Sequence, residues 1–79
     1  MNILVLGGAG DMGSCTVEDL AQTAGVTRVT IADRDTNAAE ALRQRLADAP
    51  AQVAVQPLDA TDHGAVVGAM RAHDATASA

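Results

Sequence analysis

The sequence predicts an α/β fold in which three strand–helix units form an open parallel sheet with an incomplete fourth strand. Two observations lead to this prediction. Short apolar runs, typical of strands covered on both faces, alternate with longer stretches whose apolar residues recur at helical spacing. Glycines at positions 7, 8, 10 and 13 separate the first apolar run from the first helical stretch. Successive units of this kind pair their strands in parallel through right-handed crossovers.

The first unit begins with a strand at residues 2–6, a short apolar run that ends at the glycines. A helix is expected from about Met12 to Ala24, where Gly25 is a natural stop. The positions on its apolar face are Gly13, Val17, Leu20, Ala21 and Ala24.

The second unit begins at Arg28–Asp33, whose β-branched residues predict a strand. One of residues 35–37, which read Asp-Thr-Asn, is expected to cap a helix that runs to about Asp48. Pro50 then prevents any continuation of this helix. The apolar positions of the helix are Ala39, Leu42, Leu46 and Ala49.

The third strand is expected at Gln52–Leu58, with an early end because of its proline. Thr61 or Asp62 is expected to cap the third helix. The glycines at 64 and 68 weaken that helix by about 1 kcal/mol each relative to alanine. Residues Asp74–Ala79 stand where a fourth strand begins, but they are small and weakly β-forming.

Composition limits the classes of function. With 79 residues and no Phe, Tyr or Trp, the chain can form one small domain with a thin aliphatic core. Its net charge of −5, without a basic stripe, argues against nucleic acids and anionic membranes as partners. The single Cys excludes a disulfide framework and, without clustered His, a zinc site. The first apolar run is too short for a signal peptide or a membrane span, so a cytoplasmic protein is expected.

Gly8, Gly10 and Gly13 form a G-x-G-x-x-G turn between strand and helix, and Asp33 ends the next strand 20 positions beyond Gly13. This context is typical of a Rossmann dinucleotide site. Gly8 is expected to permit the tight turn, Gly10 to let a pyrophosphate approach the backbone, and Gly13 to let the helix lie near the strand. Unpaired amides and the dipole at the helix start then stabilise the phosphate charge. A glycine turn that serves packing alone is the alternative.

Asp33 is expected to accept hydrogen bonds from the adenosine ribose, which favours NAD because a 2′-phosphate would meet a carboxylate. Arg34 favours NADP instead, since a guanidinium there can cover a 2′-phosphate or stack on adenine. We predict NAD, with NADP as the alternative. Asp11 and Met12 lie within the turn and are counted among the cofactor-binding residues. The charge of Asp11 either repels the pyrophosphate or faces solvent in the first helical turn.

Three segments resemble the nucleotide-binding half of the saccharopine dehydrogenase family: NILVLGGAGDMGS at 2–14, VTIADRD at 29–35 and PLDATD at 57–62. The resemblance covers about residues 2–73, and A-D-R-D and L-D-A-T-D are its more particular motifs. It implies an NAD(P)-dependent oxidoreductase that passes a hydride between the nicotinamide and a carbon bearing an amine. It fails after residue 73, where the family has an apolar strand and this chain reads A-T-A-S-A.

The resemblance also implies site residues and a place in a larger protein. By position, it assigns the pyrophosphate to Gly8, Gly10 and Gly13, the ribose to Asp33 and Arg34, and the adenine to Asp59 and Ala60. Residues 1–79 are then the N-terminal part of a dinucleotide-binding Rossmann domain, and the substrate domain lies outside the chain. The chain alone is therefore expected to be inactive, with the missing domain or a homo-oligomer as its protein partner.

Other functions remain open. Gly7, Gly10 and Gly13 also fit the turn of short-chain dehydrogenases and epimerases, but these need a Tyr-x-x-x-Lys pair, and the chain has neither Tyr nor Lys. A regulatory module that senses NAD(H) or another adenine nucleotide shares the glycine turn and the acid after the second strand. A truncated product that binds nothing is the third possibility.

The remaining reactive side chains are interpreted as structural. Cys15 lies opposite the apolar face of its helix and is expected to be an inert thiol. His63 and His73 are expected at the surface. Met12 and Met70 are interpreted as core fillers in preference to cofactor contacts, which for Met12 is the alternative to its place among the cofactor-binding residues. No catalytic residue and no metal site is expected in this chain.

Overall fold

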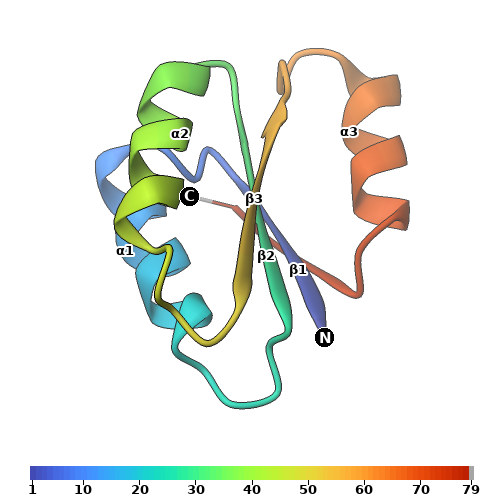
Figure 1. The fold of residues 1–79 in the computed structure, drawn as a ribbon. Coiled ribbons are helices and arrows are strands. Elements are labelled where there is room, and N and C mark those ends of the chain that lie inside the picture. Colours follow the sequence, from blue (N-terminus) through green and yellow to red (C-terminus); the bar gives the residue numbers. More distant parts are fainter. Residues whose placement is uncertain (79) are drawn as a thin grey trace.

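The computed structural model describes residues 1–78, which fold into four strands and three helices in alternation (Figure 1). Their bounds are β1 Asn2–Leu6, α1 Asp11–Ala21, β2 Arg28–Asp33, α2 Thr36–Arg45, β3 Gln52–Pro57, α3 His63–Arg71 and β4 Ala75–Ser78. The first two strands have the bounds that the sequence predicts.

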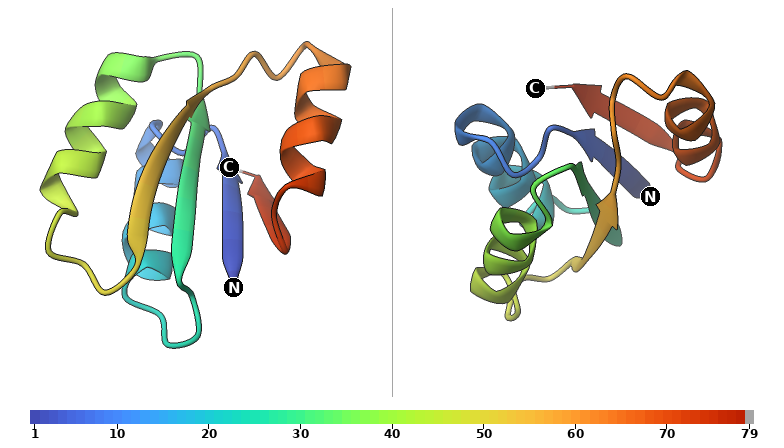
Figure 2. Two further views of the ribbon diagram at one scale, coloured as in Figure 1. Left: turned by 45° about the vertical axis from the view of Figure 1, so that its right-hand side comes forward. Right: turned by 90° about the horizontal axis from the view of Figure 1, so that it is seen from above.

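The sheet is parallel throughout and has the strand order β3-β2-β1-β4. The chain moves outward from β1 to β3 and then crosses back to the far side of β1, so β3 and β4 are the two outer strands (Figure 2). Because crossovers are right-handed, this reversal puts α1 and α2 on one face of the sheet and α3 on the other. The α/β Rossmann-like open sheet predicted from the sequence is therefore confirmed.

Alternation along the strands divides the apolar side chains between two clusters. On the side of α1 and α2, Ile3 and Val5 of β1 pack with Val17 and Ile31. On the side of α3, Leu4 packs with a smaller set of buried residues: Ala32, Leu58 and Ala69. β1 is thus covered on both faces, which explains its uninterrupted apolar run.

The first helix ends earlier than its periodicity predicts. It stops at Ala21 rather than Ala24, because the amides of Gln22 and Thr23 donate to carbonyls three residues back and tighten the last turn. Gly25 follows in the left-handed conformation, with a φ of 89°. Ala24 is therefore exposed, and its placement on the apolar face is wrong.

The other boundaries differ in the same direction. α2 ends at Arg45 rather than Asp48, since the amide of Leu46 already donates to a carbonyl three residues back. β3 ends at Pro57, as its proline predicts, and the next amide still donates to the carbonyl of Asp33. β4 is short and pairs with β1 along four residues, from Ile3 to Leu6. Among residues 1–78, no helix has the length and apolar character needed to cross a membrane.

Candidate functional site

The glycine turn between β1 and α1 is bent at Gly7. This residue has a φ of 73°, in the left-handed region that favours glycine, and its amide donates to the carbonyl of Ala32 at 2.9 Å. The amide of Gly10 donates back to the carbonyl of Gly7 at 3.2 Å and closes the turn. The left-handed bend is therefore at Gly7, one residue before the Gly8 to which the sequence assigns the tight turn.

Gly8 and Gly13 are needed because the turn is tightly packed. A Cβ on Gly8 would stand 3.0 Å from Ile31 Cγ2 and 3.2 Å from the carbonyl of Val5. A Cβ on Gly13 would stand 2.0 Å from the carbonyl oxygen of Gly7, where no atom fits. The close approach of helix to strand predicted for Gly13 is thus confirmed.

Gly10 differs from these two glycines. A Cβ there would meet nothing nearer than the Gly7 carbonyl oxygen at 3.5 Å, an ordinary contact. Its φ of −75° and ψ of 174° are also open to any residue. The fold itself therefore does not require glycine at position 10, and the open space beside its backbone is what a side chain would fill.

Gly10 is the N-cap of α1, and within residues 1–78 no side chain caps this helix. The first amides of α1, at Asp11, Met12 and Gly13, precede the first intrahelical bond and lie at the positive end of the helix dipole. Asp11 is exposed, and Met12 is 79% exposed. The interpretation of Met12 as a core filler is wrong, because its side chain is largely exposed.

Asp33 fastens the glycine turn to the end of β2. Its Oδ2 accepts the amide of Ala9 at 3.1 Å, and its Oδ1 accepts the amide of Asp35 at 3.0 Å. The carboxylate thus holds two loops in place and keeps its remaining lone pairs for a ligand. The sequence gives no indication of the contact with Ala9, which depends on the pairing of β1 with β2.

A hollow of about 120 Å³ opens beside Asp33 at the carboxyl ends of the first three strands. Its lining comes from the ends of β1 and β2 and the segment after β3: Leu6, Gly7, Ala32, Asp33, Arg34, Leu58 and Ala60. The structure thus brings Asp33, Arg34 and Ala60 together, as the sequence predicts for residues of one site. Ligands of open α/β sheets bind at this carboxyl edge.

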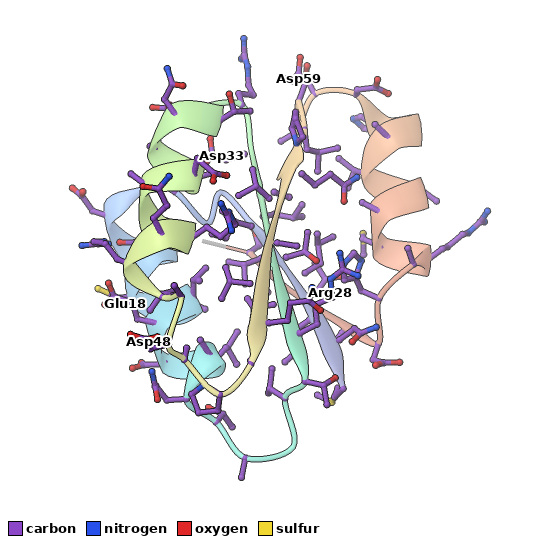
Figure 3. All side chains as sticks on the ribbon, viewed as in Figure 1. Glu18, Arg28, Asp33, Asp48 and Asp59 are labelled. Atoms are coloured by element: carbon purple, nitrogen blue, oxygen red, sulfur yellow. The ribbon has the colours of Figure 1, made fainter. Side chains whose placement is uncertain are left out.

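Asp59 lies at the same end of the sheet as Asp33 (Figure 3). Its Oδ1 accepts the hydroxyl of Thr61 at 2.7 Å and the amide of Thr61 at 2.9 Å. These two hydrogen bonds hold the pKa of Asp59 below its ordinary 3.8, and the positive charge of Arg34 lowers it further. A carboxylate held by Thr61 therefore lies in the sequence between Leu58 and Ala60, which line the hollow together with Arg34.

Residues outside this hollow are structural or exposed. Cys15 and His63 are exposed, in agreement with the sequence. Met70 is 44% exposed, so its interpretation as a core filler is wrong. Among the residues that the structure describes, no group of three or more His, Cys, Asp and Glu side chains could hold a metal ion.

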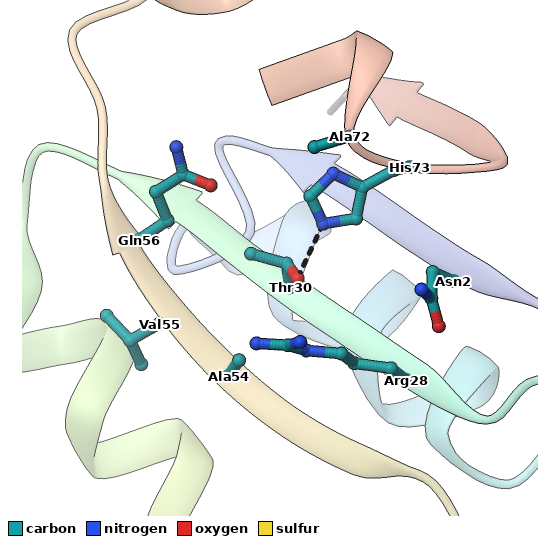
Figure 4. Close-up of a pocket in the computed structure, with 8 residues that line it drawn as sticks. All are labelled: Asn2, Arg28, Thr30, Ala54, Val55, Gln56, Ala72 and His73. Carbon is teal, nitrogen blue, oxygen red and sulfur yellow. Dashed lines mark hydrogen bonds between the residues drawn. The ribbon is translucent and has the colours of Figure 1, made fainter. Parts of the chain in front are cut away.

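His73 is half-buried, so its placement as a surface residue is wrong. Its Nδ1 lies 2.7 Å from the carbonyl oxygen of Ala69, and its Nε2 lies 2.7 Å from the hydroxyl of Thr30, which is 3% exposed. Because a carbonyl can only accept, we assign the proton to Nδ1. His73 thereby satisfies a buried hydroxyl and ties the end of α3 to β2 (Figure 4).

A larger hollow of about 330 Å³ lies away from the turn, over β2 and β3 on the side of α3 (Figure 4). Arg28, Gln56 and His73 are among its lining residues. It borders neither the glycine turn nor the end of β2. Size alone therefore does not choose between the two hollows. The convergence of backbone amides with Asp33 and Arg34 makes the hollow beside the turn the candidate site.

Comparison with known proteins gives one family. The family model described as Saccharopine dehydrogenase NADP binding domain matches residues 3–79. None of the curated proteins matches the chain. The matched range includes the glycine turn, the ends of β2 and β3, and all three helices. It also continues through β4, so the expectation that the resemblance fails after residue 73 is wrong.

Proposed function

This chain belongs to the saccharopine dehydrogenase NADP-binding domain family, and we propose that its glycine turn binds the diphosphate of NADP(H) within an oxidoreductase. The observation that carries the proposal is the uncapped start of α1 beside Gly10. Amides without a capping side chain at a helix N-terminus favour a bound anion. Gly10 leaves room for the close approach that a diphosphate requires.

The adenosine half of the cofactor fits the hollow beside Asp33. Ala60 and Leu58 offer apolar contact to the adenine from the segment after β3. Asp33 faces the ribose, with both of its oxygens already oriented by backbone amides. Asp59, which precedes Ala60 in the sequence, is a second polar contact for the adenine.

We propose NADP(H) rather than the NAD(H) that the position of Asp33 favours in the sequence. The description of the matched family names NADP. Arg34 is exposed and lines the hollow, where its guanidinium can pair with a 2′-phosphate. The amides of Ala9 and Asp35 offset part of the negative charge of Asp33. NAD(H) remains the second candidate, because Asp33 also lines the hollow.

The reaction itself belongs to the complete oxidoreductase. When bound, the nicotinamide supplies the hydride chemistry, which in this family involves a carbon bearing an amine. The residues of this chain bind and orient: the turn fixes the diphosphate, and the ends of β2 and β3 fix the adenosine. We assign no substrate residue within the chain.

Fluorescence titration of NADPH and NADH with the chain tests the proposal. The chain has no Trp or Tyr, so nicotinamide emission is read without a protein background. We expect enhanced emission and tighter binding of NADPH. Replacing Arg34→Gln removes charge-assisted hydrogen bonds and should weaken NADPH about tenfold while changing NADH little. If NADH bound tenfold more tightly than NADPH, the role of Arg34 would be wrong.

The variant Gly10→Val tests the diphosphate position. The side chain would fill the space beside the turn, so binding should be lost while the melting temperature stays near that of the parent. Gly68→Val is the matched control, because nothing lies within 4 Å of a Cβ at that position on α3. Unchanged affinity of Gly10→Val would refute the diphosphate site.

A further inference from the structure

β3 is an open edge of the sheet. It is the outermost strand on its side, and a hollow borders it on each face, about 330 Å³ on the side of α3 and about 250 Å³ beside α2. Edge strands are usually protected by charged residues or bulges against pairing with another chain. The segment Gln52–Gln56 has neither, and its protection is limited to Pro57 at the end.

The sequence of this edge is self-complementary. Residues Gln52–Gln56 read Q-V-A-V-Q, which is the same in both directions about Ala54. In an antiparallel pair of two such strands related by a two-fold axis at Ala54, each Gln faces a Gln and each Val faces a Val. A symmetric contact of this kind is what an isologous dimer interface requires.

The backbone groups of β3 fit that register. The amides of Gln52 and Leu58 donate to carbonyls on the β2 side, at 2.9 and 3.1 Å. The directions of N–H and C=O groups alternate along a strand. The backbone groups of the even-numbered residues therefore point to β2, and the backbone groups of Val53 and Val55 point outward. Ala54 therefore falls at a non-hydrogen-bonded position of any antiparallel pair on this edge, and a two-fold axis can pass through such a pair.

We propose that β3 pairs antiparallel with β3 of a second copy of this chain, which joins two sheets into one. The amide of Val53 donates to the carbonyl of the partner's Val55, and the carbonyl of Val53 accepts the amide of the same residue. The two-fold axis repeats these two hydrogen bonds between Val55 and the partner's Val53, so four form in total. Ala54 meets the partner's Ala54 on the axis. This inference does not depend on the proposed cofactor site, which lies at the carboxyl ends of the strands.

Side chains on both faces agree with this pairing. Val53 and Val55 already pack against the core on the side of α2, so valines of the second copy extend the same apolar layer. They also cover the hollow beside α2, which Leu46 and Ala47 help to line. On the other face, Gln52 lies opposite the partner's Gln56, and amides pair as donor and acceptor.

One residue at each end limits the length of the pairing between the two copies. The amide of Ala51 is already bonded to the carbonyl of Ala21, and Pro57 has no amide hydrogen. The contact is thus limited to five residues of each copy, which predicts a weak dimer. Each copy carries a net charge of −5, so salt should strengthen the dimer by screening the repulsion between the copies.

Light scattering and sedimentation of the whole chain, over a range of concentrations at about 0.15 M salt, test the proposal. We expect a monomer–dimer equilibrium. The double variant Gln52→Lys with Gln56→Lys puts like charges opposite each other twice and should weaken the dimer about tenfold. Gln52→Glu with Gln56→Lys puts opposite charges together in the same register and should restore dimerisation. Circular dichroism melting shows that the variants are folded.

Oxidative cross-linking reads the register directly. In a Cys15→Ser background, Ala54→Cys puts two thiols on the axis, where Cα atoms of a non-hydrogen-bonded pair stand about 4.5 Å apart and a disulfide can form. Gln52→Cys is the control, because each thiol then faces a Gln. Cross-linking of the first variant alone supports the proposal. A monomer at every concentration, a dimer indifferent to the lysine variant, or growth beyond a dimer would overturn it.

Discussion

At the scale of single residues, three of the four glycines of the turn have different roles. Gly7 supplies the left-handed bend, Gly13 permits contact with the backbone of Gly7, and Gly10 leaves space outside the fold. The sequence predicts the last two roles from spacing alone. It cannot assign the bend between Gly7 and Gly8, because both precede the helix and only the backbone angles distinguish them.

Substitution of Gly13 should destabilise the fold. A methyl group in Gly13→Ala would overlap the carbonyl of Gly7, and overpacking of this kind costs about 1–3 kcal/mol. For a chain of this size we expect a fall in melting temperature of about 5 °C or more. Gly10→Ala is the matched control and should melt near the parent. Equal melting of all three proteins would contradict the close packing at Gly13.

Asp59 should make stability depend on pH. Its folded pKa lies below the ordinary 3.8 because Thr61 donates two hydrogen bonds and Arg34 adds a positive charge. A lowered folded pKa contributes stability above the unfolded pKa, and this contribution is lost as pH falls through the folded pKa. In urea unfolding, Asp59→Asn should therefore be less stable than the parent at neutral pH.

The same comparison in acid is the control for Asp59. As the pH falls through the lowered folded pKa of Asp59, the parent carboxyl becomes protonated, so the difference in stability between the parent and Asp59→Asn should shrink. A difference that stays constant from neutral pH into acid would show that the charge of Asp59 has no part in it.

At the scale of helices and strands, local chemistry fixes where elements begin better than where they end. Asp35 caps α2 by accepting the amide of Ala38 at 3.0 Å, and Asp62 caps α3 by accepting the amide of Ala65 at 3.1 Å. Both caps are among those that the sequence predicts. The helix ends depend on weaker turns, so α1 and α2 stop earlier than their apolar periodicity indicates.

Two glycines with equal space predict opposite effects on stability. A Cβ at Gly68 or at Gly25 would meet nothing within 4 Å. Gly68 lies inside α3, so Gly68→Ala should add about 1 kcal/mol and raise the melting temperature by about 4–8 °C. Gly25 has a φ of 89°, so Gly25→Ala should cost about 1–2 kcal/mol. Thermal melts of the two variants that shift in the same direction would contradict this account.

At the scale of the whole molecule, the sequence predicts the architecture because each unit repeats the same strand–helix pattern. The strand order follows from right-handed crossovers and the reversal after β3. Contacts between distant segments are not predictable in this way. Ala9 meets Asp33, and His73 meets Thr30 across 43 positions, only because the sheet brings them together.

In the candidate site, too, some features can be predicted from the sequence and others only from the structure. The glycine turn and the acid that ends β2 can be recognised from sequence, since each is a local pattern with a fixed spacing. Only the structure shows that Asp33 also holds the turn, through its hydrogen bond with the amide of Ala9, and that Met12 is exposed. In the proposed site, the groups that hold the dinucleotide are thus largely main chain, and they are positioned by side chains whose partners lie far away in the sequence.

Backbone amide shifts measure the central claim most directly. A ¹⁵N-labelled chain should be titrated with NADPH and followed by two-dimensional NMR, with Gly10→Val as the control. We predict the largest shift changes at the amides of Ala9–Gly13, smaller ones near Asp33 and Arg34, and none in the Gly10→Val variant. Saturating NADPH that leaves the amides of the turn unmoved would contradict the claim that this turn holds the diphosphate.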